Sequence, residues 1–164
     1  MGRRSVKENK SIYQLKREEK GLTREAASEL IDGISPQRLE KLESGKTAVQ
    51  PEDVLMLSRA YKEPGLCNYY CSNECAIGRK SVPEIEEKEL PQIIIETVNS
   101  INKLHGAKDR LLQIAEDGAV TADEYEDFMQ LKNVVDKLSV SAATLQLWFD
   151  DQAAKGNIDP EAFK

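Results

Sequence analysis

Four short sequence motifs divide the stretch between Ile12 and Tyr61: Lys20-Gly21-Leu22-Thr23, Asp32-Gly33-Ile34-Ser35, Glu43-Ser44-Gly45-Lys46 and Pro51-Glu52-Asp53. The glycines follow apolar-periodic runs, where a residue in the left-handed conformation ends a helix at low cost. Thr23 and Ser35 come next as N-caps, because their hydroxyls can accept bonds from free helix amides. Pro36 takes the first helical position, where its missing N–H costs nothing. We therefore expect four short helices in a compact bundle that can present one helix to a major groove.

The apolar residues of this stretch recur at helical spacing and predict the core of the bundle. We expect Leu39 and Leu42 to face that core. The other expected core residues are Leu15, Leu22, Ala26, Leu30, Ile34, Val54, Leu55 and Ala60.

Three of these motifs resemble those of a known family. Gly21-Leu22-Thr23 opens the second helix, Gly33-Ile34-Ser35 opens the third, and Glu43-Ser44-Gly45-Lys46 closes it. In this respect the first third of the chain resembles the lambda-repressor-like (Cro-type) helix-turn-helix domain, which we place at residues 1–64. Two features depart from the family pattern: Thr23 and Ser35 lie one residue further apart than is usual, and Arg24 stands where glutamine is common.

The resemblance implies that a recognition helix over residues 35–44 enters the major groove of double-stranded DNA. Its candidate base contacts are Ser35, Gln37, Arg38 and Lys41. Gln37 could pair with adenine and Arg38 with guanine. Each of these side chains could instead be a solvated residue of a small domain, and Arg38 and Lys41 have glutamates nearby with which to pair.

Other residues are candidates for contact with the phosphate backbone. Thr23 and Arg24 begin the second helix, whose free amides favour anions. Lys46 and Thr47 follow the recognition helix and could hold the other side of the site. A basic N-terminal arm could reach along the backbone or into the minor groove. Its residues are Arg3, Arg4, Lys7 and Lys10.

Charge is divided unevenly along the chain. The 164 residues carry a net charge of −6, but residues 1–50 hold 11 Lys and Arg against 8 Asp and Glu, a net of +3. The remaining residues hold 12 Lys and Arg against 21 Asp and Glu, a net of −9. Phosphate contact requires local positive charge, and that charge lies on the segment assigned to DNA. The acidic part could bind a protein partner instead.

All three cysteines lie in the segment 65–90, which we expect to hold a short helix and a linker. Cys67, Cys71 and Cys75 are spaced at i, i+4 and i+8, so on a helix they would share one face. They could pack as small apolar residues, sense redox state, or bind a metal with His105 as a fourth ligand. No second pair of cysteines exists for a structural zinc site, and packing is the favoured interpretation.

Residues 91–164 predict an antiparallel hairpin of two long helices. The first begins at Pro91 and stops at Asp117-Gly118; its apolar stripe is Ile94, Val98, Ile101, Leu104, Leu111, Leu112 and Ala115. Thr121 caps the second, with Glu124 at the capping-box position, and Gly156 ends it. The second helix carries a heptad seam of Phe128, Leu131, Val135, Leu138, Ala142, Leu145 and Phe149. Stripe and seam could cover each other within one chain or form a homodimer.

The later chain is also similar to phage- and prophage-type regulators with a helical C-terminal tail. The similarity rests on the segments 75–85, 89–91, 109–111 and 114–118. It implies transcriptional regulation. The expected protein is all-α, with a bundle of four to five short helices followed by the hairpin. An alternative is an antitoxin- or antirepressor-like interaction module that keeps the helix-turn-helix as a scaffold.

Several other classes are disfavoured by the sequence. One histidine, no Gly-rich phosphate loop and no nucleophile motif give no constellation for an enzyme, so we expect neither catalysis nor a cofactor. No apolar run approaches the roughly 18 residues that span a bilayer. The start, Met1-Gly2-Arg3-Arg4-Ser5, has no apolar region typical of a secretory signal, and we expect a cytoplasmic protein.

Overall fold

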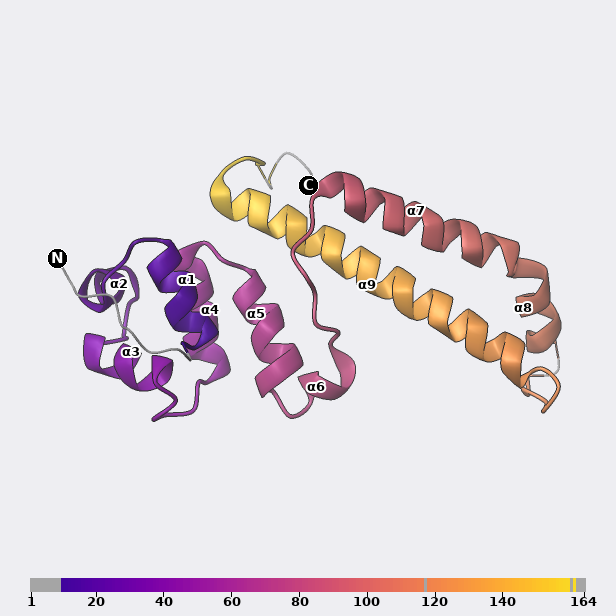
Figure 1. The fold of residues 1–164 in the computed structure, drawn as a ribbon, viewed down its shortest axis with the longest axis horizontal. Coiled ribbons are helices and arrows are strands. Elements are labelled where there is room, and N and C mark those ends of the chain that lie inside the picture. Colours follow the sequence, from indigo (N-terminus) through magenta and orange to yellow (C-terminus); the bar gives the residue numbers. More distant parts are fainter. Residues whose placement is uncertain (1–9, 117, 160, 162–164) are drawn as a thin grey trace. The chain divides into compact units, whose positions relative to one another are not determined.

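The structure is a computed structural model that describes residues 10–116, 118–159 and 161 (Figure 1). Within them it contains nine α-helices, one π-helix and no strand, which confirms the predicted all-α class. The chain divides into two compact units. One is Ile85–Phe149, and the other holds the chain up to Glu84 and from Asp150 onward. No helix of the described part has the length and hydrophobicity needed to cross a membrane.

The first four helices follow the predicted caps and stops. They are α1 (Ile12–Glu19), α2 (Arg24–Leu30), α3 (Pro36–Glu43) and α4 (Pro51–Tyr61). Thr23 Oγ1 accepts from the amide of Ala26 at 3.2 Å, and Ser35 Oγ accepts from the amide of Arg38 at 3.2 Å. A glycine with positive φ follows each of the first three helices, as the turn motifs predicted: Gly21, Gly33 and Gly45.

One buried cluster holds these helices together. Its members are Tyr13, Ala27, Ile31, Ile34, Leu39, Leu42, Val54, Leu57, Tyr61 and Leu66. The prediction was wrong for Leu15, Leu30 and Leu55, which are 40%, 58% and 48% exposed. Such short helices allow more than one apolar face to be drawn from spacing, and only packing against neighbours selects the buried one.

The cysteine segment is less regular than a single helix. It consists of α5 (Gly65–Tyr69), a π-helix η1 (Tyr70–Glu74) and α6 (Gly78–Ser81). Cys75 is extended, with φ −73° and ψ 124°, so the three cysteines do not form the regular helical face that their spacing suggested. Gly78 lies against the Cys71 backbone so closely that an added Cβ would lie 2.1 Å from the Cys71 carbonyl oxygen.

The other unit contains a helical hairpin. Helices α7 (Leu90–Gly106) and α8 (Lys108–Ala115) precede α9 (Tyr125–Lys155), which belongs to this unit as far as Phe149. Helices α7 and α9 run antiparallel (Figure 1). The predicted single helix from Pro91 breaks at Ala107, whose amide bonds to the carbonyls of both Lys103 and Leu104. Gly106 favours a break there because glycine lacks helix propensity.

The second long helix also begins later than predicted, at Tyr125 rather than just after Thr121. The Glu124 carboxylate still accepts from the Thr121 amide at 3.2 Å, as a capping box requires. Gly156 follows the end of α9 with φ +79°, as expected for a helix stop.

Candidate nucleic-acid interface

Helix α3 divides into a buried and an exposed face. Leu39, Leu42 and Glu43 are buried. The side chains exposed along the helix and at its ends are Ser35, Gln37, Arg38, Glu40, Lys41 and Ser44. The predicted base-contacting residues therefore all belong to the exposed set.

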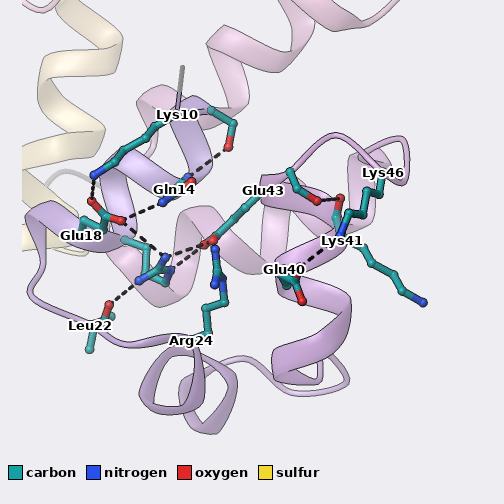
Figure 2. A network of polar contacts seen from close by, with 12 residues as sticks. Lys10, Gln14, Glu18, Leu22, Arg24, Glu40, Lys41, Glu43 and Lys46 are labelled. Carbon is teal, nitrogen blue, oxygen red and sulfur yellow. Dashed lines mark hydrogen bonds and ion pairs between the residues drawn. The ribbon is translucent and has the colours of Figure 1, made fainter. Parts of the chain in front are cut away.

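Glu43 anchors α3 to the two preceding helices (Figure 2). Its side chain is fully buried and accepts from Arg17 Nε at 2.5 Å and from a second Arg17 nitrogen at 3.0 Å. Arg17 also donates to the Leu22 carbonyl oxygen at 2.6 Å. Burial disfavours the Arg17 cation, but its hydrogen bonds to Glu43 outweigh this and raise the pKa of Arg17. The pair fixes the orientation of α3, because two matched nitrogens and oxygens define one geometry.

Arg24, a predicted phosphate contact, belongs to the same cluster. Its Nε donates to Glu43 Oε2 at 2.8 Å, and the Arg24 side chain is 33% exposed. Sequence reasoning missed this cluster. The signal was present: Glu43 lies four residues after Leu39, on the core-facing side of α3, where a charged residue needs a partner.

Arg38 also has a partner within the domain. Its guanidinium donates to Asp53 Oδ1 at 2.7 Å, while Asp53 Oδ2 accepts from the Gln50 amide at 3.1 Å in the capping box of α4. Asp53 is buried, but the Arg38 side chain remains 49% exposed. The pair joins α3 to α4 and leaves the outer edge of the guanidinium at the surface.

The end of α3 has a different charge arrangement. Lys46 Nζ lies 3.2 Å from Glu40 Oε1, so the one acidic side chain on the exposed face is neutralised by a neighbour. Lys41 is exposed, makes no ion pair with any described residue, and extends away from the surrounding carboxylates in Figure 2. Thr47 is exposed beside it, and its amide bonds to the Lys41 carbonyl. Of the cations on this face, Arg38 and Lys46 are therefore held in ion pairs, whereas Lys41 is exposed.

The remaining predicted DNA contacts fall into two groups: some bond within the domain, and others lie outside the described residues. The Thr23 and Ser35 hydroxyls cap their own helices. Lys10 Nζ lies 2.6 Å from Glu18, and hydrogen bonds from Lys10 and Gln14 lower the pKa of that carboxylate. The arm residues Arg3, Arg4 and Lys7 lie outside the described residues.

The three cysteines form no metal centre in the described part of the chain, where no group of three His, Cys, Asp or Glu side chains could hold an ion. All three are free and partly buried. Burial and the neighbouring thiols raise the pKa of Cys71. Hydrogen bonds from the Gly78 and Ile77 amides lower the pKa of Cys75. His105 is exposed on α7.

Comparison with known proteins agrees with this geometry. Residues 14–65 match a family model described as Helix-turn-helix, HTH_3. This segment is a helix-turn-helix domain. Its two central helices are α2 and α3, and domains of this type place the second of them in the major groove. No curated protein and no solved structure matches the chain.

Proposed function

We propose that the protein is a sequence-specific DNA-binding transcriptional regulator of the phage or prophage repressor-like type, which reads the major groove with residues 35–44. One observation carries the proposal: the helix-turn-helix match covers four helices in which the polar face of α3 is exposed on a well-packed domain. A rigid scaffold with an exposed second helix is what direct readout of bases requires.

The ion pairs of the domain assign different tasks to the predicted contacts. Gln37 and Lys41 are exposed and suit base or phosphate contact. Arg38 is held against α4 by Asp53, which limits the directions in which its guanidinium can reach. Arg24 is bound to Glu43 and positions the helices. We therefore assign recognition mainly to Gln37 and Lys41.

Selection of bound sites from random duplex DNA tests this function. We expect an enriched sequence with two half-sites, because a single helix-turn-helix reads too few bases. The selected duplex is then titrated by fluorescence anisotropy at several salt concentrations. Failure to enrich any sequence, together with no binding at low salt, would overturn the proposal.

Two variants refine this titration. Lys41→Ala should weaken binding to all duplexes and reduce the slope of log affinity against log salt by about 1, because one phosphate contact is lost. Lys80→Ala is the matched control, since Lys80 is an exposed lysine on α6. Gln37→Ala should instead reduce discrimination at one base position, by roughly 1–3 kcal/mol. Equal behaviour of Lys41→Ala and Lys80→Ala would refute the role assigned to Lys41.

A second candidate is an interaction module, antitoxin- or antirepressor-like, that binds a protein through its acidic part. It is favoured by one observation: three cations predicted to meet DNA, Arg24, Arg38 and Lys46, are all held in ion pairs within the domain. A folded protein that binds no DNA in the titration above would favour this alternative.

A further inference from the structure

The three cysteines lie where the regular α-helix gives way to another geometry. Helix α5 passes into η1, and the amide of Cys75 bonds to the Tyr70 carbonyl, five residues back, at 2.9 Å. Bonds of this spacing define a π-helix, which is rare and occurs frequently at functional sites. The π-turn contains Cys71 and ends at Cys75, so the unusual backbone coincides with two of the three thiols.

The π-turn brings Cys71 and Cys75 close to each other. The Tyr70 carbonyl belongs to the peptide group that precedes Cys71, so its bond to the Cys75 amide also ties the two cysteines together. With standard bond lengths, their Cα atoms lie within roughly 7 Å of each other. Disulfides join residues whose Cα atoms are about 4.4–6.8 Å apart. The separation therefore suits a disulfide.

The backbone of Cys75 removes the usual obstacle to such a bond. On a regular helix every side chain tilts toward the N-terminus, so two cysteines four residues apart point in the same direction. Cys75 is extended, with φ −73° and ψ 124°, and its side chain is free of that constraint. Cys67 does not compete for Cys75, because a helical rise of about 1.5 Å per residue places it on the order of 10 Å away.

Cys75 has the surroundings of a reactive thiol. Its sulfur accepts a hydrogen bond from the Gly78 amide at 3.4 Å. Bonds from the Gly78 and Ile77 amides lower the pKa of Cys75. The Arg79 cation lowers this pKa further, and the Cys75 side chain is partly exposed. Accessible thiols in electropositive surroundings are the ones that oxidise first.

Cys71 has the complementary properties of a resolving thiol. Burial raises the pKa of Cys71, and the neighbouring Cys75 raises it further, so Cys71 stays a neutral thiol beside the more acidic one. Gly78 packs so closely on the Cys71 backbone that it holds the turn after Cys75 against η1. A second thiol beside a reactive one is the usual arrangement of a redox-sensitive pair.

The core of the helix-turn-helix domain holds this pair in place. Leu66 belongs to the buried cluster, and Tyr70 packs against it. On the other side of Cys71, Glu74 accepts from the Tyr13 hydroxyl of α1 at 3.1 Å. The segment is thus anchored before and after Cys71, and the geometry of the two thiols belongs to the folded domain.

We propose that Cys75 is a site of reversible oxidation by hydrogen peroxide and that Cys71 is its resolving thiol. The Cys75 thiolate attacks one peroxide oxygen and the O–O bond breaks. The departing hydroxide takes the proton that Cys75 released and becomes water, which leaves a sulfenic acid on Cys75. The Cys71 sulfur then attacks that sulfur, the S–O bond breaks, and a second water leaves with the Cys71 proton. Two thiols and one peroxide thus give one disulfide and two waters, with two electrons passed to the peroxide.

Treatment of the reduced, full-length protein with a small excess of hydrogen peroxide tests the proposal. We expect each chain to lose the mass of two hydrogens, and dithiothreitol should reverse the change. Proteolysis after Tyr70 and Glu74 separates the three cysteines onto different fragments. The disulfide should join residues 71–74 to the fragment that begins at Cys75.

Three variants assign the roles. Cys75→Ser should slow the peroxide-dependent loss of thiols at least about 10-fold, because the stabilised thiolate is gone. Cys71→Ser should leave a sulfenic acid on Cys75 that dimedone traps. Cys67→Ser is the matched control, since Cys67 is also a partly buried cysteine of this segment, and it should form the disulfide at the wild-type rate. Circular dichroism checks folding, and Cys71→Ala replaces Cys71→Ser if the serine variant is unfolded.

Several results would overturn the proposal: no peroxide-dependent loss of thiols in the wild type, a disulfide that includes Cys67 or joins two chains, or no dimedone adduct on Cys75 in the variant that lacks the Cys71 thiol. Alkylation by iodoacetamide provides a further check. Cys75 should react fastest in the folded protein and at the same rate as the others in concentrated urea. A preference for Cys75 that persists in urea would contradict a role for the folded turn. These measurements use no DNA, so the proposal stands or falls independently of the proposed function.

Discussion

Replacing Glu43 with glutamine should destabilise the helix-turn-helix domain more than any comparable surface change. The carboxylate is fully buried and accepts three hydrogen bonds, two from Arg17 and one from Arg24 (Figure 2). The Arg17 side chain is only 6% exposed, so Glu43→Gln takes the hydrogen-bonded carboxylate from a buried cation and leaves it, among the described carboxylates, only Glu18 Oε1, at 3.9 Å. Breaking one side of a buried ion pair costs about 3–5 kcal/mol.

That cost is large for a domain of this size. At roughly 0.05–0.15 kcal/mol per residue, the free energy of unfolding of the helix-turn-helix domain is only several kcal/mol. A loss of about 3 kcal/mol would lower the melting temperature by roughly 12–24 °C, at about 4–8 °C per kcal/mol. Much of the Glu43→Gln protein would therefore be unfolded at moderate temperature.

Urea unfolding followed by circular dichroism measures the effect, and Glu40→Gln is the matched control. Glu40 lies one turn earlier on the same helix, but its carboxylate is 49% exposed and pairs only with the exposed Lys46. Its replacement should cost at most about 1 kcal/mol, as for other surface pairs. Equal unfolding midpoints for the two variants would refute the reasoning. Joint replacement of Arg17 by Met and Glu43 by Leu should cost less than Glu43→Gln alone, because the cation that then loses Glu43 is Arg24, whose side chain is 33% exposed rather than buried.

Two further predictions concern buried side chains and close backbone contacts. Burial raises the pKa of both Tyr61 and Tyr13 above the ordinary 10.0, so their stabilising contribution is complete below pH 10 and is lost as pH rises above it. The Tyr61 hydroxyl is buried without a partner among the described residues, so Tyr61→Phe should be no less stable than the wild type at pH 7. In urea titrations at alkaline pH, Tyr61→Phe should lose stability less steeply with rising pH than the wild type. A steeper loss would contradict this prediction. Gly78→Ala should cost about 1–3 kcal/mol, because the new Cβ would overlap the Cys71 carbonyl. Gly106→Ala, which meets no atom within 4 Å, should instead stabilise by about 0.4–1 kcal/mol, and equal melting temperatures for the two variants would refute the packing argument.

Local chemistry made much of the first domain predictable. Thr23 and Ser35 cap helices where hydroxyl residues follow glycine turns, and Gly21 and Gly33 adopt the positive φ that only glycine takes without strain. These effects act over three or four residues, so they can be read from a short stretch of sequence. The exposed face of α3 followed from the same periodicity.

Side chains that act across long distances in sequence were not predicted in the same way. Glu43 lies 26 residues from Arg17, and Asp53 lies 15 residues from Arg38. Local rules allowed Arg24 and Arg38 to point to DNA equally well. Packing of helices against one another decided that each meets a buried carboxylate of its own domain.

The sequence alone determined the all-α class, the helix-turn-helix and the antiparallel hairpin, because caps, glycine stops and apolar spacing are local properties. Only the tertiary structure decided which apolar residues are covered and which cations are already paired. It left Val98 and Val135 at the surface and placed Glu43 between two arginines. Burial and ion pairing depend on the simultaneous positions of several helices, and spacing along one helix does not contain that information.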